Sequence, residues 1–267
     1  MPGEKFADAA FMSMALHQGI LYGPVRSRRL GRSLGINVLP NDVKVCNMNC
    51  AYCQYGWTPT RRWDRHGVAW PSPQSIETVV SARLRDAAER GELIDRITVA
   101  GHGEPTLHPD FEEIAERLAR VRDAVAPAIR LAILSNSTTA GWPDVRRGLA
   151  RFDEPHMKLD AGDPITYARV NGSGTSIATI VDALRDLPRV IVQAMFVSDP
   201  AGQTDNTGEG AVTEWLGAIE TIQPSRVQVY TIDRPTASHD LHAAPAYRLR
   251  EIAERVRSLG IPADVFR

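Results

Sequence analysis

The sequence predicts one α/β domain built as an open parallel β/α barrel of six strand–helix units. Three observations support this fold class. Short apolar runs rich in β-branched residues alternate with amphipathic segments along the chain. Most of these runs are continuously apolar, which is typical of strands covered on both faces of a parallel sheet. The length of 267 residues and the hydrophobic fraction of 43% suit one large domain with a buried core. Six units form three-quarters of a full eightfold barrel, with the helices outside the sheet.

The six expected strands are short and separated by segments long enough to hold a helix. They cover residues 34–39, 96–100, 130–134, 156–160, 190–197 and 226–232. The first helix is expected after Ser72, which can cap it, with Pro73 at the first helical position and Gly91 at its end. The later helices are expected to begin near Pro109, Pro143, Ser176, Val212 and Pro245, and the stripe of apolar residues is weakest in the helix near Pro143.

We divide the chain into an N-terminal extension, residues 1–20, and a core domain, residues 21–267, that ends in a short helix and tail. The first twenty residues contain no sustained apolar run, so we do not expect a signal peptide. No stretch approaches the ~20 apolar residues of a membrane-spanning helix. Three closely spaced cysteines cannot form a closed disulfide framework. We therefore expect a soluble, reduced, cytoplasmic protein with no membrane partner.

The distinctive polar segments all follow expected strands. A cysteine-rich loop follows the first strand, residues 101–105 follow the second, residues 135–137 follow the third, and residues 231–234 end the sixth. In parallel β/α barrels the functional groups collect on the loops at the carboxyl ends of the strands. We therefore expect these four loops to form one site.

The three cysteines of the chain, Cys46, Cys50 and Cys53, form a C-x3-C-x2-C run. A four-iron, four-sulfur cubane normally takes one cysteine per iron, so a cubane bound here would keep one iron open to a small molecule. A structural zinc site is the alternative, with His66 as the nearest fourth ligand. Incidental burial of the three thiols is a weaker alternative, because Asn47 and Asn49 make a poor core segment.

The cysteine run, with Tyr52 before the third cysteine, resembles the C-x3-C-x-aromatic-C signature of the radical S-adenosylmethionine (radical SAM) superfamily. Residues 101–105 resemble its Gly-Gly-Glu-Pro motif, with His102 in place of the first glycine. Residues 27–35, 103–109, 158–161 and 230–235 are similar to the branch of wyosine-synthase-like iron–sulfur oxidoreductases, and the likeness spans about residues 23–235. The extra cysteines with which wyosine synthases and peptide-maturing members hold a second cluster are missing.

The resemblance implies an oxidoreductase or lyase-type enzyme with one 4Fe-4S cluster and S-adenosylmethionine (SAM). Cys46, Cys50 and Cys53 would bind three irons as thiolates, and the fourth iron would chelate the amino and carboxylate groups of SAM. One electron, from a donor such as flavodoxin or ferredoxin, would cleave SAM. The resulting 5′-deoxyadenosyl radical would abstract hydrogen from the substrate.

The resemblance also implies contacts between SAM and the loops. Tyr52 would lie against the adenine, although simple packing is the more common role of an aromatic residue beside a strand. Gly103 would let the backbone approach the methionine moiety, Glu104 would accept from its ammonium, and His102 is included by position. The alternative for this motif is a tight turn before a helix.

Further contacts are expected from the third to the fifth strand. Ser135 and Asn136 would meet the ribose or carboxylate, or serve only as turn residues. Lys158 and Asp160 alternate along their strand and so point to the barrel interior, as Gln193 does on the next strand. A buried lysine needs an anionic partner, which would be the SAM carboxylate or Asp160 itself.

The substrate cannot be identified from the sequence. Residues 21–66 hold eight basic and two acidic residues, a net charge of about +6, although the whole chain has a net charge of −1. Arg28, Arg29 and Arg234 are candidates to hold a phosphate or carboxylate, and ordinary surface arginines are the alternative. We expect a small anionic or phosphorylated substrate rather than RNA, because no RNA-binding domain is appended; a tRNA base is the alternative.

Overall fold

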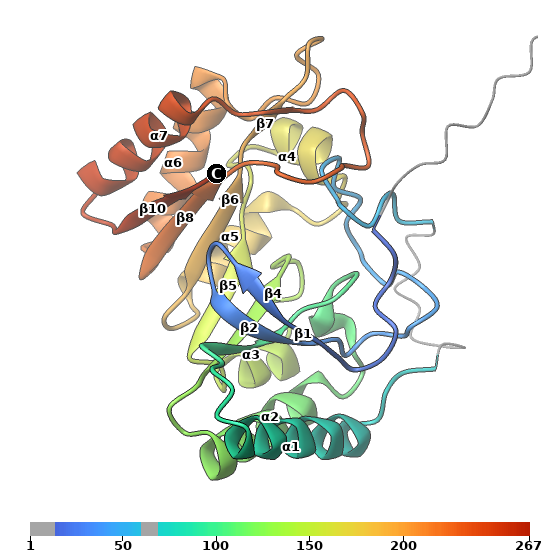
Figure 1. Cartoon of the computed structure of the whole chain (residues 1–267). Helices are drawn as coiled ribbons and strands as arrows, with labels where there is room; N and C mark the ends of the chain where they lie inside the picture. The colour runs from blue at the N-terminus through green and yellow to red at the C-terminus, as the bar shows by residue number, and fades with distance from the viewer. Residues whose placement is uncertain (1–13, 60–68) are drawn as a thin grey trace, which may run out of the picture.

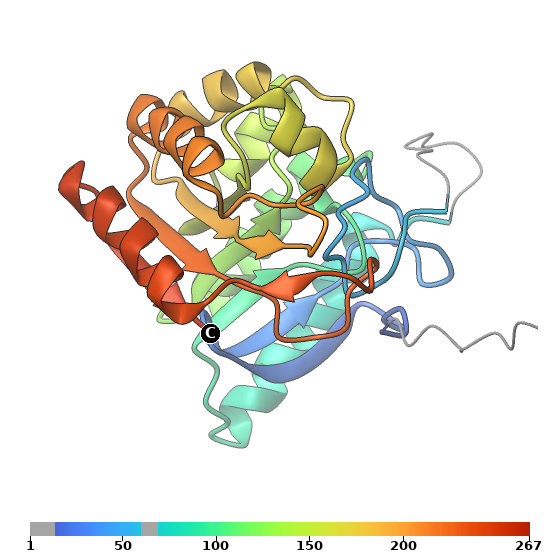
Figure 2. The same ribbon diagram turned by 90° about the horizontal axis from the view of Figure 1, so that it is seen from above.

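The computed structural model describes residues 14–59 and 69–267, which form a strongly curved sheet with helices on its outer face (Figures 1 and 2). The strand order is β1-β2-β3-β4-β5-β6-β8-β10, and all neighbours are parallel except β1 and β2. These strands are β1 (Leu21–Ser27), β2 (Gly31–Ile36), β3 (Arg96–Val99), β4 (Arg130–Ser135), β5 (Glu154–Lys158), β6 (Ile191–Met195), β8 (Arg226–Tyr230) and β10 (Ala263–Phe266). Strands β7 (Val197–Ser198) and β9 (His242–Ala243) pair separately.

Helices follow the strands as the alternating pattern predicts. They are α1 (Pro73–Glu89), α2 (Phe111–Val125), α3 (Pro143–Leu149), α4 (Pro164–Asn171), α5 (Ile177–Arg185), α6 (Glu209–Ile222) and α7 (Ala246–Ser258), with a 3₁₀ turn η1 (Pro105–Leu107). Ser72 caps α1 by accepting from Ser75 N, and Pro73 begins the helix, as predicted. The partial β/α barrel is thus confirmed, with β2, β3, β4, β5, β6 and β8 as the six predicted strands.

The elements that the sequence did not predict include β1, β10 and α4. Strand β1 contains Gly23 and Pro24, which interrupt the strand pattern, and most of its residues keep some exposure. Strand β10 is only four residues long and lies at the other edge of the sheet. Helix α4 is short and is capped by Asp163, whose side chain accepts from Ile165 N and Thr166 N. Its position matters, because its carboxyl end supports the cysteine loop.

The core fills the space between the sheet and the outer helices. Phe111 and Phe152 stack with ring centroids 6.2 Å apart beneath α2, and Trp215 on α6 packs edge-on against Phe196. Trp215 Nε1 also donates to the Leu159 carbonyl at 2.9 Å, which fixes the chain just after β5. No helix of the described chain has the length and apolar character to cross a bilayer.

Residues 14–20, the described part of the predicted N-terminal extension, pack on the core. Met14 N donates to the Gln54 carbonyl at 2.8 Å, and Asn37 N donates to the Ile20 carbonyl at 2.7 Å. The remaining part of that extension lies outside the described residues, as do Arg61, Arg62 and Arg65, which were counted in the basic segment, and His66, the alternative zinc ligand.

Candidate active site

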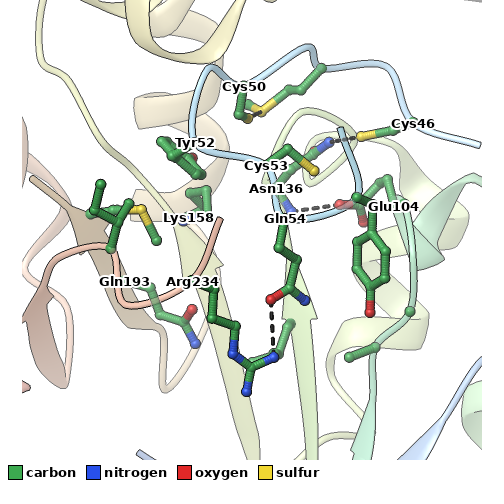
Figure 3. A pocket seen from close by; sticks show the side chains of 18 of the residues that line it. Cys46, Cys50, Tyr52, Cys53, Gln54, Glu104, Asn136, Lys158, Gln193 and Arg234 are labelled. Carbon is green, nitrogen blue, oxygen red and sulfur yellow. Dashed lines mark hydrogen bonds between the residues drawn. The ribbon is translucent and has the colours of Figure 1, made fainter. Parts of the chain in front are cut away.

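A cavity of about 260 Å³ lies at the carboxyl ends of the strands, where the predicted loops meet. Figure 3 shows the three cysteines at one end of this cavity and Gln193 and Arg234 toward the other. The cavity wall includes the following predicted residues: Cys46, Cys50, Tyr52, Cys53, Gly103, Glu104, Ser135, Asn136, Lys158, Gln193, Arg29 and Arg234. Residues far apart in the sequence therefore form one site because parallel strands bring their carboxyl ends to the same edge.

The cysteine loop is held by backbone hydrogen bonds to three other segments. Asn49 N and Ala51 N donate to the Asn171 and Val170 carbonyls at the end of α4, both at 3.0 Å. Ser238 N donates to the Ala51 carbonyl at 2.8 Å, and Glu104 N donates to the Val45 carbonyl at 2.9 Å. The loop conformation is thus fixed by the fold.

Each thiol receives an N–H donor from a different side chain. Asn136 Nδ2 lies 3.7 Å from Cys46 Sγ, Asn171 Nδ2 lies 3.6 Å from Cys50 Sγ, and Lys44 Nζ lies 3.2 Å from Cys53 Sγ. The sequence did not predict that Lys44 and Asn171 contact the thiols. Lys44 lies only two residues before Cys46, but Asn171 is distant in sequence, and nothing in its surroundings predicts contact with a thiol.

The surroundings of the thiols favour metal binding over ionisation in the absence of a metal. Burial raises the pKa of Cys46 to about 12 and that of Cys50 to about 11, so a bound metal must displace the thiol protons. In the described chain, no group of three or more His, Cys, Asp or Glu side chains is arranged around a single metal ion. A cubane takes one cysteine per iron, so its three thiolates need not meet at one point. The three thiols would fit such a cluster as ligands, and all three line the cavity.

Glu104 connects the loops after β3 and β4. Its Oε1 accepts from Thr106 Oγ1 at 2.6 Å and from Ser135 Oγ at 2.9 Å, and its Oε2 accepts from Asn136 N at 2.6 Å. Burial raises the pKa of Glu104, and these hydrogen bonds act in the opposite direction. A carboxylate offers about four acceptor positions, so Oε2 keeps the capacity for a donor from the cavity.

Two residues of the Gly-His-Gly-Glu-Pro segment, His102 and Gly103, pack closely against neighbouring loops, and Gly103 also lines the cavity. The His102 side chain is fully buried outside the cavity, where Nε2 contacts the Pro40 carbonyl at 2.6 Å and Nδ1 accepts from His17 N at 3.2 Å. Gly103 does allow a close backbone approach, but toward the cysteine loop. A Cβ at this position would lie 1.9 Å from the Val45 carbonyl oxygen. His102 is therefore a buried supporting residue, whereas Gly103 lines the cavity and also packs against the cysteine loop.

The variant Gly103→Ala is expected to destabilise the protein by about 2 kcal/mol or more, because backbone must shift to make room for the methyl group. Gly217→Ala is the matched control, since a Cβ there meets nothing within 4 Å and the residue lies inside α6. The control should gain up to about 1 kcal/mol. Urea unfolding of both variants measures the difference. Equal stability of the two variants would contradict the close packing of the two loops.

Lys158 and Asp160 belong to a buried network beside Cys50. Asp160 Oδ2 accepts from Asn171 Nδ2 at 2.7 Å and from the Tyr52 hydroxyl, and Oδ1 accepts from Met195 N at 2.8 Å. Strand β5 ends at Lys158, so Asp160 lies beyond it and does not line the cavity. The predicted direct contact of Asp160 with a cofactor is therefore replaced by a supporting position.

Lys158 has partners within the protein and also faces the cavity. Its Nζ donates to the Tyr230 hydroxyl at 2.7 Å and lies 3.6 Å from Asp160 Oδ1 and 4.9 Å from the centre of the Tyr52 ring. Burial acts to lower the pKa of Lys158, but Asp160 and Tyr230 more than offset this effect, so the net shift is upward. Lys158 therefore presents a positive charge to the cavity.

A neighbouring cavity of about 670 Å³ shares Arg29, Tyr230 and Arg234 with the first one. Arg29 Nη1 donates to Gln193 Oε1 at 2.7 Å, and its guanidinium lies 4.1 Å from the centre of the Tyr230 ring. Gln193 Nε2 is buried and has no hydrogen-bond partner among the described residues. Tyr230, which organises both Lys158 and Arg29, was not singled out from the sequence.

The other predicted arginines lie at the rim of this neighbouring cavity. Arg28 lines it and pairs with Asp233 at 2.7 Å, with both side chains nearly half exposed. Arg234 donates to Gln54 Oε1 at 3.1 Å (Figure 3). Arg26, which was counted only in the basic segment, also lines the cavity.

A family model described as the radical SAM superfamily matches residues 41–198. The chain is 30% identical over 224 residues to a UPF0026 protein of Helicobacter pylori (strain J99), an alignment that covers 82% of this chain and 68% of the relative. Among the curated relatives, the matched share of the relative's own length ranges from 31% to 82%.

Solved structures share the fold at low sequence identity. A radical SAM methyltransferase from Sphaerobacter thermophilus superposes with a TM-score of 0.61 at 16% identity, over 88% of this chain and 65% of the other. A structure of TYW1 with a lysine-pyruvate adduct bound gives a TM-score of 0.60 at 15% identity, over 85% of this chain and 73% of the other. At this identity the likeness concerns the fold alone.

Proposed function

The chain belongs to the radical SAM superfamily, and from this premise we propose that it is an enzyme acting on a small substrate that carries a carboxylate or phosphate. Members of the superfamily are enzymes that use a 4Fe-4S cluster and SAM. When bound, these cofactors supply a one-electron cleavage of SAM and the hydrogen-abstracting 5′-deoxyadenosyl radical. What is specific to this chain is how its side chains would hold the cofactors and select the substrate.

Cys46, Cys50 and Cys53 would hold the cluster, and the cavity wall would orient SAM beside it. Glu104 Oε2 has the capacity to accept from an ammonium group. The Lys158 ammonium offers a charge for a carboxylate. Asn136 Nδ2 donates to Asn47 Oδ1 and to Cys46 Sγ. Its amide nitrogen therefore supports the cysteine loop rather than being free to bind a ribose.

The substrate class is inferred from three arginine side chains at the cavity that have no acidic partner among the described residues. Arg26, Arg29 and Arg234 line the 670 Å³ cavity, and none has a carboxylate within 4 Å among the described residues. Arg29 is half-buried. Its guanidinium donates a hydrogen bond to Gln193 and lies over the Tyr230 ring, and both of these groups are neutral. A partly desolvated guanidinium group such as that of Arg29 is stabilised by a carboxylate or phosphate, which it can bind with two parallel hydrogen bonds, whereas Arg26 and Arg234 are exposed and add positive charge at the cavity.

The size of the site also favours a small molecule. The two adjoining cavities of about 260 and 670 Å³ are comparable to small-molecule sites, which typically occupy ~300–1,000 Å³. The Arg29 guanidinium lies at their junction, so an anion bound there would lie at the boundary between the cofactor cavity and the neighbouring one. A substrate fixed at its anionic end would present another carbon to the radical.

Arg29→Gln is expected to weaken the response to substrate by roughly 10–100-fold, because a hydrogen bond to a charged group contributes about 1.5–3 kcal/mol. The assay screens unlabelled carboxylates and phosphate esters for stimulation of 5′-deoxyadenosine formation by the reconstituted wild-type protein. Compounds that stimulate are then tested on Arg29→Gln, with Arg120→Gln on α2 as a charge-matched control.

The same assay separates the proposal from the RNA alternative. Stimulation by a small anion that is lost only in Arg29→Gln would support the proposal. Stimulation by tRNA alone, with salt-sensitive binding of labelled tRNA, would contradict it. An undiminished response of Arg29→Gln to the small anion would contradict the assignment of Arg29.

A further inference from the structure

Lys44 is a buried lysine without an acidic partner. The residue is 7% exposed. Nζ donates to the Gly56 carbonyl at 2.6 Å and lies 3.2 Å from Cys53 Sγ. Among the residues that the structure describes, no carboxylate lies within 4 Å of this nitrogen, although acidic partners are common for the arginines of the chain. Burying an ammonium group is costly unless an anion compensates for it. Of the two hydrogen-bond partners that Lys44 Nζ has among the described residues, the Cys53 thiol is the one that can become an anion.

The donor at Cys53 also differs from those at the other two cysteines. The side-chain N–H donors to Cys46 and Cys50 are neutral amides, Asn136 Nδ2 at 3.7 Å and Asn171 Nδ2 at 3.6 Å, although the charges of Lys44 and Lys158 also favour these two thiolates. Cys53 faces a positively charged group at the shorter distance of 3.2 Å. Hydrogen bonds in which donor and acceptor are both charged are shorter and about twice as strong as neutral ones. The surroundings of the three thiols are therefore electrostatically unequal.

We propose that Lys44 acts through its charge on the Cys53 thiolate and thereby raises the reduction potential of the bound cluster. Hydrogen bonds to the sulfurs and the net charge around an iron–sulfur cluster are among the factors that set its potential. Reduction adds one electron and hence one negative charge, with no bond formed or broken. A nearby cation stabilises the reduced state more than the oxidised one. Lys44 is thus a positioning residue that acts through a cluster ligand.

Three substitutions separate the effect of the Lys44 charge from that of its hydrogen bond to the Gly56 carbonyl. Lys44→Arg keeps the charge and the donors, Lys44→Gln keeps a donor but loses the charge, and Lys44→Met loses both. Each protein is reconstituted anaerobically, its iron content is measured, and its midpoint potential is determined by a redox titration followed by electron paramagnetic resonance. Arg120→Gln on α2 removes one positive charge from the outer helix layer and serves as the control.

We expect Lys44→Gln and Lys44→Met to have at least a tenfold smaller ratio of reduced to oxidised cluster at the wild-type midpoint potential. This ratio corresponds to a fall of about 59 mV or more for a one-electron couple. Lys44→Arg and Arg120→Gln should stay close to the wild-type potential. If Lys44 acted only by holding the loop through the Gly56 carbonyl, its loss would lower the cluster content without changing the reduction potential of the clusters that remain.

The remaining outcomes also decide the proposal. Loss of the cluster from Lys44→Gln and Lys44→Met, with retention in Lys44→Arg, would count against the proposal, because a structural role at the Gly56 carbonyl gives the same result. Loss from all three variants, or an unchanged potential in loaded Lys44→Gln, would overturn the proposal. The redox titration needs no substrate, so its result does not depend on whether the proposed anionic substrate is correct.

Discussion

Replacing Cys50 with alanine is expected to abolish reductive cleavage of SAM while leaving the barrel folded. Cys50 lies on the cysteine loop and lines the cavity, and its thiol contacts Asn171 Nδ2 and Met48 Sδ without contributing a hydrogen bond to the sheet. A cluster bound by only two cysteines loses one of its three protein ligands. The expected result is no 5′-deoxyadenosine above background.

The folding of Cys50→Ala is checked by circular dichroism and urea unfolding. Removing a partly buried thiol on a loop should cost about 1 kcal/mol, as is typical of single substitutions. Met48→Leu is a volume-conserving control on the same loop and should retain the cluster. Full cleavage activity in a folded Cys50→Ala protein would contradict the assignment of the three cysteines as iron ligands.

Asp160→Ala is expected to produce the largest loss of stability, about 3–5 kcal/mol, because it removes a fully buried carboxylate and leaves the mostly buried Lys158 ammonium without its acidic partner. The carboxylate accepts hydrogen bonds from Asn171, Met195 N and the Tyr52 hydroxyl, so its removal also releases donors near Cys50. We therefore expect a second effect, a lower iron content after reconstitution.

The matched control for this variant is Asp163→Ala. Asp163 caps α4 from outside the site by accepting from Ile165 N and Thr166 N, so its loss should cost about 1 kcal/mol and leave iron binding unchanged. Urea unfolding of the reduced, metal-free proteins compares the two. If Asp160→Ala were no less stable than Asp163→Ala, the network around Asp160 would not have the structural role assigned to it.

The fold could be predicted because its determinants are local. Continuous apolar runs such as residues 131–134 identify strands covered on both faces, and Ser72 with Pro73 identifies the start of a helix. The short strand β10 could not be predicted, because it depends on pairing with β8, which the sequence pattern does not reveal. Strand β1 was missed because Gly23 and Pro24 are usually turn residues.

The candidate site was predictable at the level of loops and less so at the level of contacts. The cysteine spacing predicts the ligands, and the alternation of strands and helices predicts which loops surround them. The direction of a side chain depends on tertiary packing instead. His102 and Asp160 bind protein groups behind the cavity wall, whereas Lys44 and Asn171 contact thiols without any motif that indicates it.

The most direct test is anaerobic reconstitution of the wild-type chain with iron and sulfide, followed by metal analysis and reduction with dithionite in the presence of SAM. The account predicts a brown protein with about four irons per chain that forms 5′-deoxyadenosine, detected by mass spectrometry. A colourless protein that retains zinc, or an iron-loaded protein that forms no 5′-deoxyadenosine, would contradict it.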